Sequence, residues 1–211
     1  MNGMDKSQMG STHSRWWKPA VGLAIAFILV LVILVPVMAD SAAARAVLRD
    51  RDGDQAGEFY FLERDDNAVT VMGYLTNVPA GFHGFHLHEY GECDPPDFLS
   101  AGGHYNPGED NHPHHEGDFP SPLVMKNGYA LLIFQTDRFN VDEILSGNGT
   151  AVILHESPDN FANIPERYGG PDETTLSNGD SGDRIACGVV EETDEVDQSF
   201  LRSLHDLFPT D

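Results

Sequence analysis

The sequence predicts an all-β domain: an eight-stranded β-sandwich or flattened barrel with two long functional loops and a short C-terminal helix. Two observations lead to this prediction. Short segments with period-two alternation of apolar and polar residues follow one another, separated by turns rich in Asp, Gly and Asn. Two further stretches, 90–120 and 157–184, are rich in Gly, Pro, Asn and Asp and are too long to be simple turns. Long ordered loops of this kind usually carry the function.

The expected strands are short runs bounded by turn residues. Two of them are joined at Asn127-Gly128, a strong signal for a two-residue hairpin turn. Beyond residue 190 the chain becomes acidic, and apolar residues at helical spacing in 199–208 predict a short helix that packs on the sandwich or on a partner, the alternative being a frayed tail. The expected strands are 46–49, 57–64, 68–77, 82–89, 122–126, 129–136, 150–156 and 185–190.

The N-terminal segment differs from the rest of the chain. Residues 1–19 are polar and basic, and residues 20–39 form an apolar run without a charge. This pattern is typical of an export signal, which is either cleaved near Ala39 or retained as a membrane anchor. In both cases residues 40–211 are exported, and any membrane contact would be made through residues 20–39. We therefore expect three parts: a signal or anchor (1–39), a folded domain (40–191) and an acidic extension with the short helix (192–211).

The charge of the chain excludes one class of partner. The formal net charge is −22, and because residues 1–39 contribute +2, the exported part carries −24. A surface this acidic repels nucleic acid, so no nucleic-acid partner is expected.

The chain has two cysteines, Cys93 and Cys187. In an exported protein two cysteines most simply pair, here closing a loop of about 94 residues. The alternative is two free thiols or two metal-ligating cysteines.

Histidines cluster in the stretch from Gly81 to Asp118. It holds seven of the chain's ten, namely His83, His86, His88, His104, His112, His114 and His115. Imidazole is a preferred nitrogen ligand of copper, zinc and iron, so we interpret the stretch as a metal site. Residues i and i+2 of a strand point to one face, which allows His86 and His88 to reach the same ion while Phe85 and Leu87 face the core.

Three more motifs complete the pattern: Gly102-Gly-His-Tyr-Asn-Pro107, Ala151-Val-Ile-Leu-His155 and Gly182-Asp-Arg-Ile-Ala-Cys-Gly188. With these motifs in this order, the chain closely resembles the copper/zinc superoxide dismutase family over roughly residues 43–191. The resemblance implies a Greek-key β-sandwich that binds a copper ion and a zinc ion.

The resemblance also implies a role for each site residue. Asp159 would hydrogen-bond one ligand of each metal, Cys93 and Cys187 would form the disulfide, and Arg184 would stand beside copper as a fixed cation for an anionic substrate. The implied copper ligands are His86, His88, His104 and His155, and the implied zinc ligands are His104, His112, His115 and Asp118, with His104 bridging the two metals.

One loop departs from the family's pattern, because His112 and His115 are only three residues apart with His114 between them, whereas many relatives have a longer segment. Asp118 follows His115 at i+3, which favours His115 over His114 as a ligand. If the short loop did not close on zinc, the protein would bind copper only. A separate alternative is that 112–115 is simply a solvated run of histidines. His83 is interpreted as a structural histidine.

The implied activity is that of an exported superoxide dismutase, an oxidoreductase that converts superoxide to dioxygen and hydrogen peroxide. Copper would cycle between Cu(II) and Cu(I), zinc would be structural, and His104 would release copper and carry a proton. Because a charge of −24 repels superoxide, capture would depend on the local field of Arg184 and copper. Members of the family form dimers, so a homodimer is a further expectation. The alternative function is a non-catalytic sandwich that stores or delivers copper or zinc.

Overall fold

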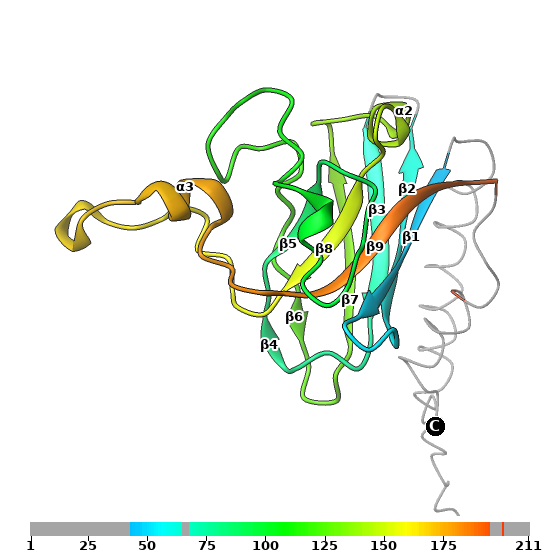
Figure 1. Ribbon diagram of the computed structural model, residues 1–211, viewed down its shortest axis with the longest axis horizontal. Coiled ribbons are helices and arrows are strands. Elements are labelled where there is room, and N and C mark those ends of the chain that lie inside the picture. The colour runs from blue at the N-terminus through cyan, green and yellow to red at the C-terminus, as the bar shows by residue number, and fades with distance from the viewer. Residues whose placement is uncertain (1–42, 65–67, 195–199, 201–211) are drawn as a thin grey trace, which may run out of the picture. The chain divides into compact units, whose positions relative to one another are not determined.

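The computed structural model describes residues 43–64, 68–194 and 200 of the 211-residue chain (Figure 1). The predicted all-β sandwich is confirmed, with few helices. The expected strand 82–89 is interrupted at His83-Gly84 and forms two strands, because both backbone groups of Gly84 bond outside the strand, to Ser157 and His155. The described strands are β1 (Ala43–Asp50), β2 (Gln55–Glu63), β3 (Val69–Leu75), β4 (Gly81–Phe82), β5 (Phe85–His88), β6 (Leu123–Val124), β7 (Ala130–Thr136), β8 (Ala151–His155) and β9 (Arg184–Thr193).

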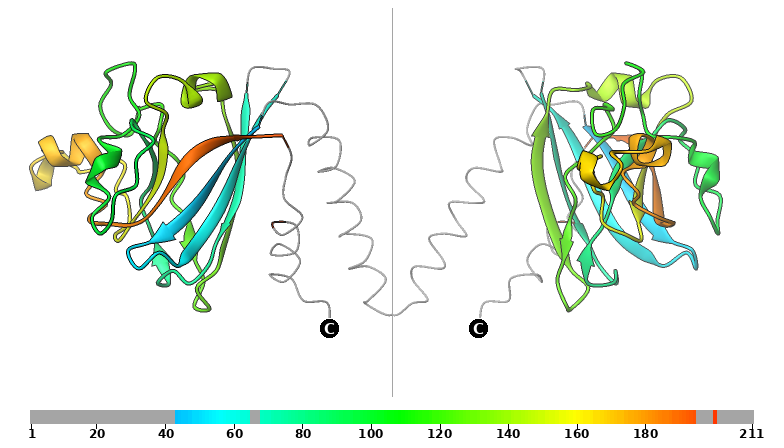
Figure 2. Two further views of the ribbon diagram at one scale, coloured as in Figure 1. Left: turned by 45° about the vertical axis from the view of Figure 1, so that its right-hand side comes forward. Right: turned by 90° about the vertical axis from the view of Figure 1, so that its left-hand side faces the viewer.

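Seven of these strands form one antiparallel sheet in the order β5-β8-β9-β1-β2-β3-β7, and β4 pairs with β6 in a separate two-stranded sheet. The large sheet curls, as the two views in Figure 2 show, so that one face of every strand turns toward a shared interior. The order also joins segments far apart in sequence, since β8 lies between β5 and β9. This arrangement brings His86, His155 and Arg184 onto neighbouring strands.

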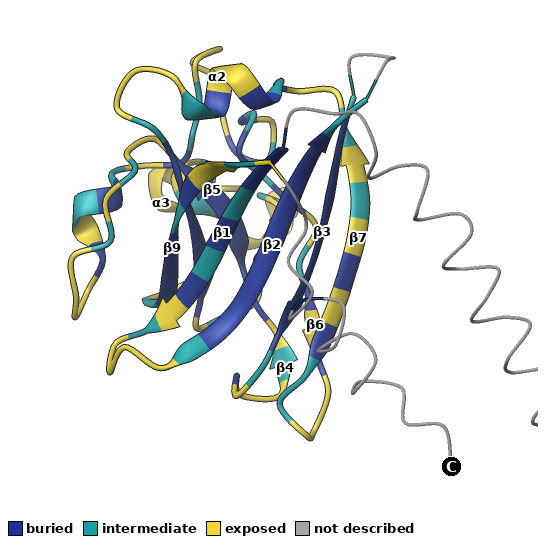
Figure 3. Ribbon diagram, turned by 90° about the vertical axis from the view of Figure 1, so that its right-hand side faces the viewer, coloured by how far each residue is buried: buried dark blue, intermediate teal, exposed yellow. Residues whose placement is uncertain are grey.

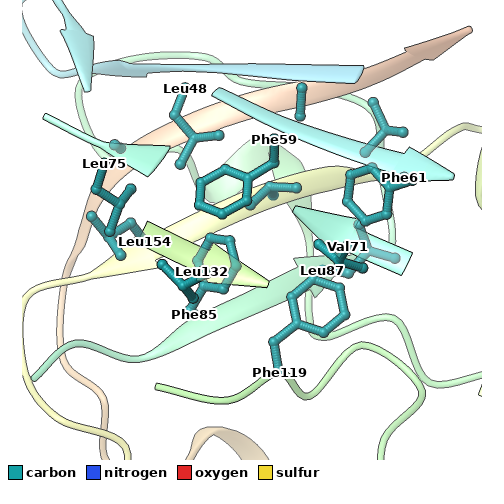
Figure 4. Packing of buried hydrophobic residues seen from close by; sticks show 14 of the residues in the cluster. Leu48, Phe59, Phe61, Val71, Leu75, Phe85, Leu87, Phe119, Leu132 and Leu154 are labelled. Atoms are coloured by element: carbon teal, nitrogen blue, oxygen red, sulfur yellow. The ribbon is translucent and has the colours of Figure 1, made fainter. Parts of the chain in front are cut away.

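The interior is built from the apolar residues that alternate along these strands (Figure 4). Aromatic rings link the two sides of the core: the ring centroids of Phe59 and Phe85 are 4.7 Å apart, and those of Phe85 and Phe119 are 5.5 Å apart. Full burial of a large apolar side chain contributes roughly 1.5–3 kcal/mol, so this cluster fixes β5 from behind. His86 and His88 lie on the opposite face of β5 from Phe85 and Leu87.

The outer face of β2 and β3 is also covered. On β7, buried residues alternate with more exposed ones, whereas β3 is buried throughout and β2 along all but its ends (Figure 3). Phe200 is helical and fully buried, with its ring centroid 4.7 Å from that of Tyr60 and 5.8 Å from that of Tyr74. The helical conformation of Phe200 agrees with the C-terminal helix expected over 199–208. The other residues of that range lie outside the described residues.

Four helical features of the loops were not predicted. The first is the 3₁₀ turn Leu99–Ala101 in the first long loop. Helix α2 (Val141–Leu145) begins at Asn140, whose side chain accepts from the Glu143 amide while the Glu143 carboxylate accepts from the Asn140 amide. The sequence contains the signal for this capping box, which is an Asn followed three residues later by a Glu. Helix α3 (Glu173–Asn178) and the 3₁₀ turn Glu166–Tyr168 lie within the second long loop. In the part of the chain that is described, no helix is long and apolar enough to cross a membrane, and the apolar run 20–39 lies outside that part.

The two cysteines form a disulfide, as predicted, with a Cα–Cα distance of 5.7 Å. Cys187 belongs to β9, and Cys93 begins the first long loop. Phe98 and Ala101 of that loop pack with Ala151, Ile153 and Cys187 in a second, smaller apolar cluster. The bond and the cluster together fasten the first loop to β8 and β9.

Removing this disulfide is expected to destabilise the domain substantially. The bridge closes a loop spanning a sequence separation of 94, for which chain-entropy estimates give about 4–5 kcal/mol of stabilisation. We expect the Cys93→Ser/Cys187→Ser double variant to unfold at a markedly lower denaturant concentration than the oxidised wild type. Wild type under reducing conditions is the control and should match the variant. Unchanged midpoints in both would contradict the prediction.

Candidate metal centre

The site begins on β5, where alternation places His86 and His88 on one face. Both side chains are almost completely buried. β5 pairs with β8 in a register that sets His86 opposite Ile153 and His88 opposite Ala151. Short antiparallel bridges also join His86 to Asp118 and His88 to His104, so the first long loop is seated against β5.

Glycine allows this loop to approach closely. The Gly117 carbonyl accepts from the Leu87 amide at 2.9 Å, and the Leu87 carbonyl accepts from the Tyr105 amide at 2.8 Å. A Cβ on Gly117 would collide with the Leu87 carbonyl. Any larger residue would therefore move the loop, and with it Asp118, away from β5.

Four imidazoles converge in a first group: His86, His88, His104 and His155, which together offer nitrogens within 4.8 Å of one another. Each ring has one nitrogen that is buried and has no hydrogen-bond partner: His86 Nδ1, His88 Nε2, His104 Nε2 and His155 Nε2. An unpaired buried polar atom costs free energy unless something binds it. Four such atoms facing one point form an all-nitrogen donor set that suits a copper ion.

In three of the four rings the hydrogen bond made by the opposite nitrogen fixes the tautomer. Nδ1 of His88 donates to the Gly102 carbonyl at 3.0 Å, and Nδ1 of His155 donates to the Gly182 carbonyl at 3.1 Å. Nε2 of His86 donates to Asp159 Oδ2 at 2.8 Å. A carbonyl or carboxylate only accepts, so the proton sits on these nitrogens and the lone pair of each ring points inward.

A second group adjoins the first through His104. Its Nδ1 lies 2.8 Å from Asp118 Oδ1 and 3.2 Å from His115 Nδ1. His112 Nδ1 lies 3.1 Å from Asp118 Oδ2 but is not aligned for a hydrogen bond. These atoms form a nitrogen- and oxygen-rich set of the type that zinc prefers.

The membership of the second group can be defined in two ways. By distance alone, a four-residue set consists of His86, His104, His112 and Asp118. Nε2 of His86, however, already donates to Asp159, and its free Nδ1 belongs to the first group. His115 is buried and reaches both His104 and Asp118, whereas His114 is exposed. We therefore assign His115, rather than His86 or His114, to the second group.

Asp159 connects the two groups. Its Oδ2 accepts from His86 and its Oδ1 accepts from His112, each at 2.8 Å. Gly179, the C-cap of α3 with φ +61°, lies directly against this carboxylate, and a Cβ there would collide with Asp159 and with His112 Nε2. The role of Gly179 was not predicted. Its signal, a glycine at a helix end, becomes visible only once α3 is recognised.

Burial and neighbouring charges determine protonation across the site. Burial, together with the charges of neighbouring histidines, lowers the pKa of His88 and His155, and burial lowers that of His86 despite Asp159. Burial and His86 lower the pKa of His104 to about 3. For His112, burial lowers the pKa, but the neighbouring carboxylates of Asp118 and Asp159 outweigh it and raise the pKa to about 9. In the metal-free protein His104 is thus neutral beside an ionised Asp118, and His112 carries a positive charge.

The metal-free protein is expected to lose stability when acidified below about pH 6.5. His86, His88, His104 and His155 have lowered pKa values in the fold, so the unfolded chain binds protons first. Each such group contributes up to about 1.4 kcal/mol per pH unit. His112 acts in the opposite sense, stabilising the fold below pH 6.5 and losing this contribution as pH rises through 9. Urea unfolding at pH 7 and pH 5 should show lower stability at pH 5, and equal stability would contradict the prediction.

Arg184 lies at the start of β9, opposite His155 in the strand register. Its Nη1 donates to the Phe98 carbonyl and its Nη2 to the Gly102 carbonyl, each at 2.6 Å. The Gly102 carbonyl also accepts from His88, so one oxygen ties the arginine to the first histidine group. The side chain is half-buried, and burial lowers its pKa, although Asp97 acts in the opposite direction. An arginine in this setting remains charged.

His83 lies outside both groups. Its Nδ1 is 2.8 Å from the His155 carbonyl and its Nε2 is 2.8 Å from the Pro79 carbonyl. The ring therefore connects the chain before β5 to the end of β8, which is the structural role expected from the sequence.

A β-sandwich that gathers two adjoining imidazole groups around one shared ring defines a class of binuclear metal proteins. The chain belongs to the copper/zinc superoxide dismutase family: residues 55–190 match the family described as copper/zinc superoxide dismutase (SODC). Together with the histidine groups, this match identifies copper and zinc as the metals of the protein.

Curated relatives support the assignment. The chain is 48% identical over 141 residues to proteins from Mycobacterium bovis and Mycobacterium tuberculosis, and 41% identical over 163 residues to one from Mycolicibacterium paratuberculosis, each named superoxide dismutase [Cu-Zn]. The first two alignments cover 58% of this chain and only 57% of those relatives' length. The third covers 68% and 71%.

Solved structures show the same fold. The clock protein EA4 is 30% identical with a TM-score of 0.60, covering 74% of this chain and 97% of that one. A SOD-like protein from Bacillus subtilis is 31% identical with a TM-score of 0.57, covering 69% and 96%.

Proposed function

We propose that the protein is a superoxide dismutase that converts superoxide to dioxygen and hydrogen peroxide. The observation that carries this proposal is the pairing of four inward-facing, unpaired imidazole nitrogens with a charged arginine on the neighbouring strand. A storage or delivery protein needs the first feature but has no evident use for the second. The mycobacterial relatives that carry the name superoxide dismutase add further support.

In this proposal His86, His88, His104 and His155 hold copper, and His104, His112, His115 and Asp118 hold zinc. When bound, copper supplies one-electron chemistry between its Cu(II) and Cu(I) states. His104 faces both groups through its two ring nitrogens, and it is the residue we assign to carry a proton from its Nε2 to the reduced product. Asp159 orients His86 and His112, so that the lone pairs required for metal binding are in place beforehand.

Arg184 provides the positive field that draws in an anionic substrate. The chain is strongly acidic, at −22, so attraction has to be local. The carbonyls of Phe98 and Gly102 fix the guanidinium next to His88. The disulfide and the Phe98 cluster hold those carbonyls in turn.

We also propose that the protein is exported, with residues 1–39 as signal or anchor, 40–191 as the catalytic domain and 192–211 as the extension. Support comes from the basic and apolar N-terminal pattern and from the disulfide, a bond typical of oxidising compartments. A homodimer is part of the proposal by analogy with the family alone.

The test is to load the purified full chain with copper and zinc, measure both metals by elemental analysis, and follow superoxide decay. We expect one copper and one zinc per chain and rapid decay that is lost when the metals are chelated. Full occupancy of both metals without activity would reject the proposal and leave a metal-storage or delivery protein.

A further inference from the structure

The loop that carries His112, His115 and Asp118 is short, and one side of it borders a cleft. The cleft has a volume of about 470 Å³ and separates the loop from the end of β7. Pro113 and His114 lie on its loop side, and Phe134 and Thr136 on its β7 side. Over this stretch, side-chain packing does not fill the space between the loop and the sheet.

Arg138, two residues after β7, reaches across to the loop. Its Nη1 donates to the His115 carbonyl at 2.9 Å and lies 3.4 Å from the carbonyls of Pro113 and Asp118. One cation thus contacts the backbone on both sides of His115 and at Asp118. Hydrogen bonds from a charged donor are roughly twice as strong as neutral ones.

The other hydrogen bonds of this loop do not connect it to β7. The His114 amide donates to Asn111 and the Asp118 amide to His115, both within the loop. The amides of His112 and Gly117 donate to Leu176 and Tyr105, which belong to other loop segments. The loop is joined to β5 through Gly117 and Asp118, and Arg138 supplies the hydrogen bonds that join it to the β7 side of the sheet.

We propose that Arg138 is a positioning residue for zinc, holding the backbone of His115 and Asp118 so that their side chains face His104 and His112 before the ion arrives. This inference rests on the zinc site of the proposed function. Such preorganisation lowers the ordering cost of binding, and outer residues of this kind typically change metal affinity about 10–100-fold. Copper held by the first histidine group would be largely unaffected, because the side-chain hydrogen bonds of Arg138 go to Pro113, His115 and Asp118, on the zinc-side loop.

The experiment compares zinc affinity, measured by chelator competition, in the full-length wild type, Arg138→Ala and Arg138→Lys. Arg167→Ala is the matched control, since that guanidinium lies over the Tyr168 ring. We expect zinc to bind at least 10-fold more weakly to Arg138→Ala, with partial recovery in the lysine variant and no change in the control. Copper affinity should stay within about twofold. The absorption of Co(II) placed in the zinc site should also shift, reporting altered ligand geometry.

Two results would overturn the inference: unchanged zinc affinity in Arg138→Ala, or equal losses of zinc and copper affinity with a lower melting temperature of the metal-free protein, which would indicate a general structural role. Should Arg138→Ala fail to fold, Arg138→Gln provides the same comparison. The inference can fail independently of the proposed function, because a fully loaded wild type without activity rejects the enzyme and leaves the zinc-affinity ratio intact.

Discussion

Replacing His155 with glutamine is expected to reduce superoxide decay at least about 100-fold and to weaken copper binding by a comparable factor. His155 supplies one of the four unpaired inward nitrogens, and its Nδ1 is fixed by the Gly182 carbonyl. Replacing residues that merely support a ligand costs roughly 10–100-fold, so removing the ligand itself should cost at least as much. Zinc binding should persist, because the second group does not include His155.

The matched control is His114→Gln, the same substitution at an exposed histidine near the second group. It should retain wild-type activity and wild-type contents of both metals. A His155→Gln variant with full copper content and wild-type activity would exclude His155 from the site. Loss of zinc in His114→Gln would show that the assignment of His115 is wrong.

Reversing the charge at Arg184 should produce a loss of activity that depends on ionic strength. Arg184→Glu is expected to lower the second-order rate constant by roughly 10-fold or more at low salt, since steering by local charge changes association rates by about 10–10³-fold. Screening shortens the reach of the field from about 30 Å at 0.01 M to about 8 Å at 0.15 M salt. The ratio of wild-type to variant rates should therefore fall as salt is added.

Because Arg184 also bonds the Phe98 and Gly102 carbonyls, charge and structure have to be separated. Arg184→Lys keeps the positive charge but loses the two-pronged hydrogen bonding to the carbonyls. Arg184→Gln removes the positive charge without introducing a negative one. Rates in the order wild type, Lys, Gln, Glu at low salt would support steering. An equal loss in Arg184→Glu at low and high salt would reject it and leave Arg184 as a structural residue.

Much of the fold was predictable because its signals are local. Period-two alternation and the Asn127-Gly128 turn identify strands from neighbouring residues alone. The break between β4 and β5 was missed because it depends on Gly84 bonding to Ser157 and His155, about seventy residues away. Likewise, α3 lies in a loop whose composition predicts no helix. Its first turn is capped by the side chain of Asp172, which accepts from the Thr175 amide.

In the candidate site, too, the residues with local sequence signals were predicted and those that depend on distant contacts were not. Histidines at strand spacing and distinctive motifs pointed to the residues that converge. Arg138 and Gly179 were not predicted, because their roles arise from contacts with backbone and side chains distant in sequence. A single arginine after a strand forms no recognisable sequence motif. Whether a glycine is required depends on which neighbouring atoms a Cβ would collide with, and the sequence does not show these.

The single carboxylate of Asp159 has a thermodynamic consequence. Its two oxygens accept hydrogen bonds from His86 and His112 at once, so binding of one metal is expected to restrict the carboxylate that orients a ligand of the other. By thermodynamic linkage, the factor by which bound zinc changes the affinity for copper must equal the factor by which bound copper changes the affinity for zinc. Calorimetric titrations run in the two opposite orders of addition should therefore yield one coupling constant, and Asp159→Asn should bring that constant close to unity.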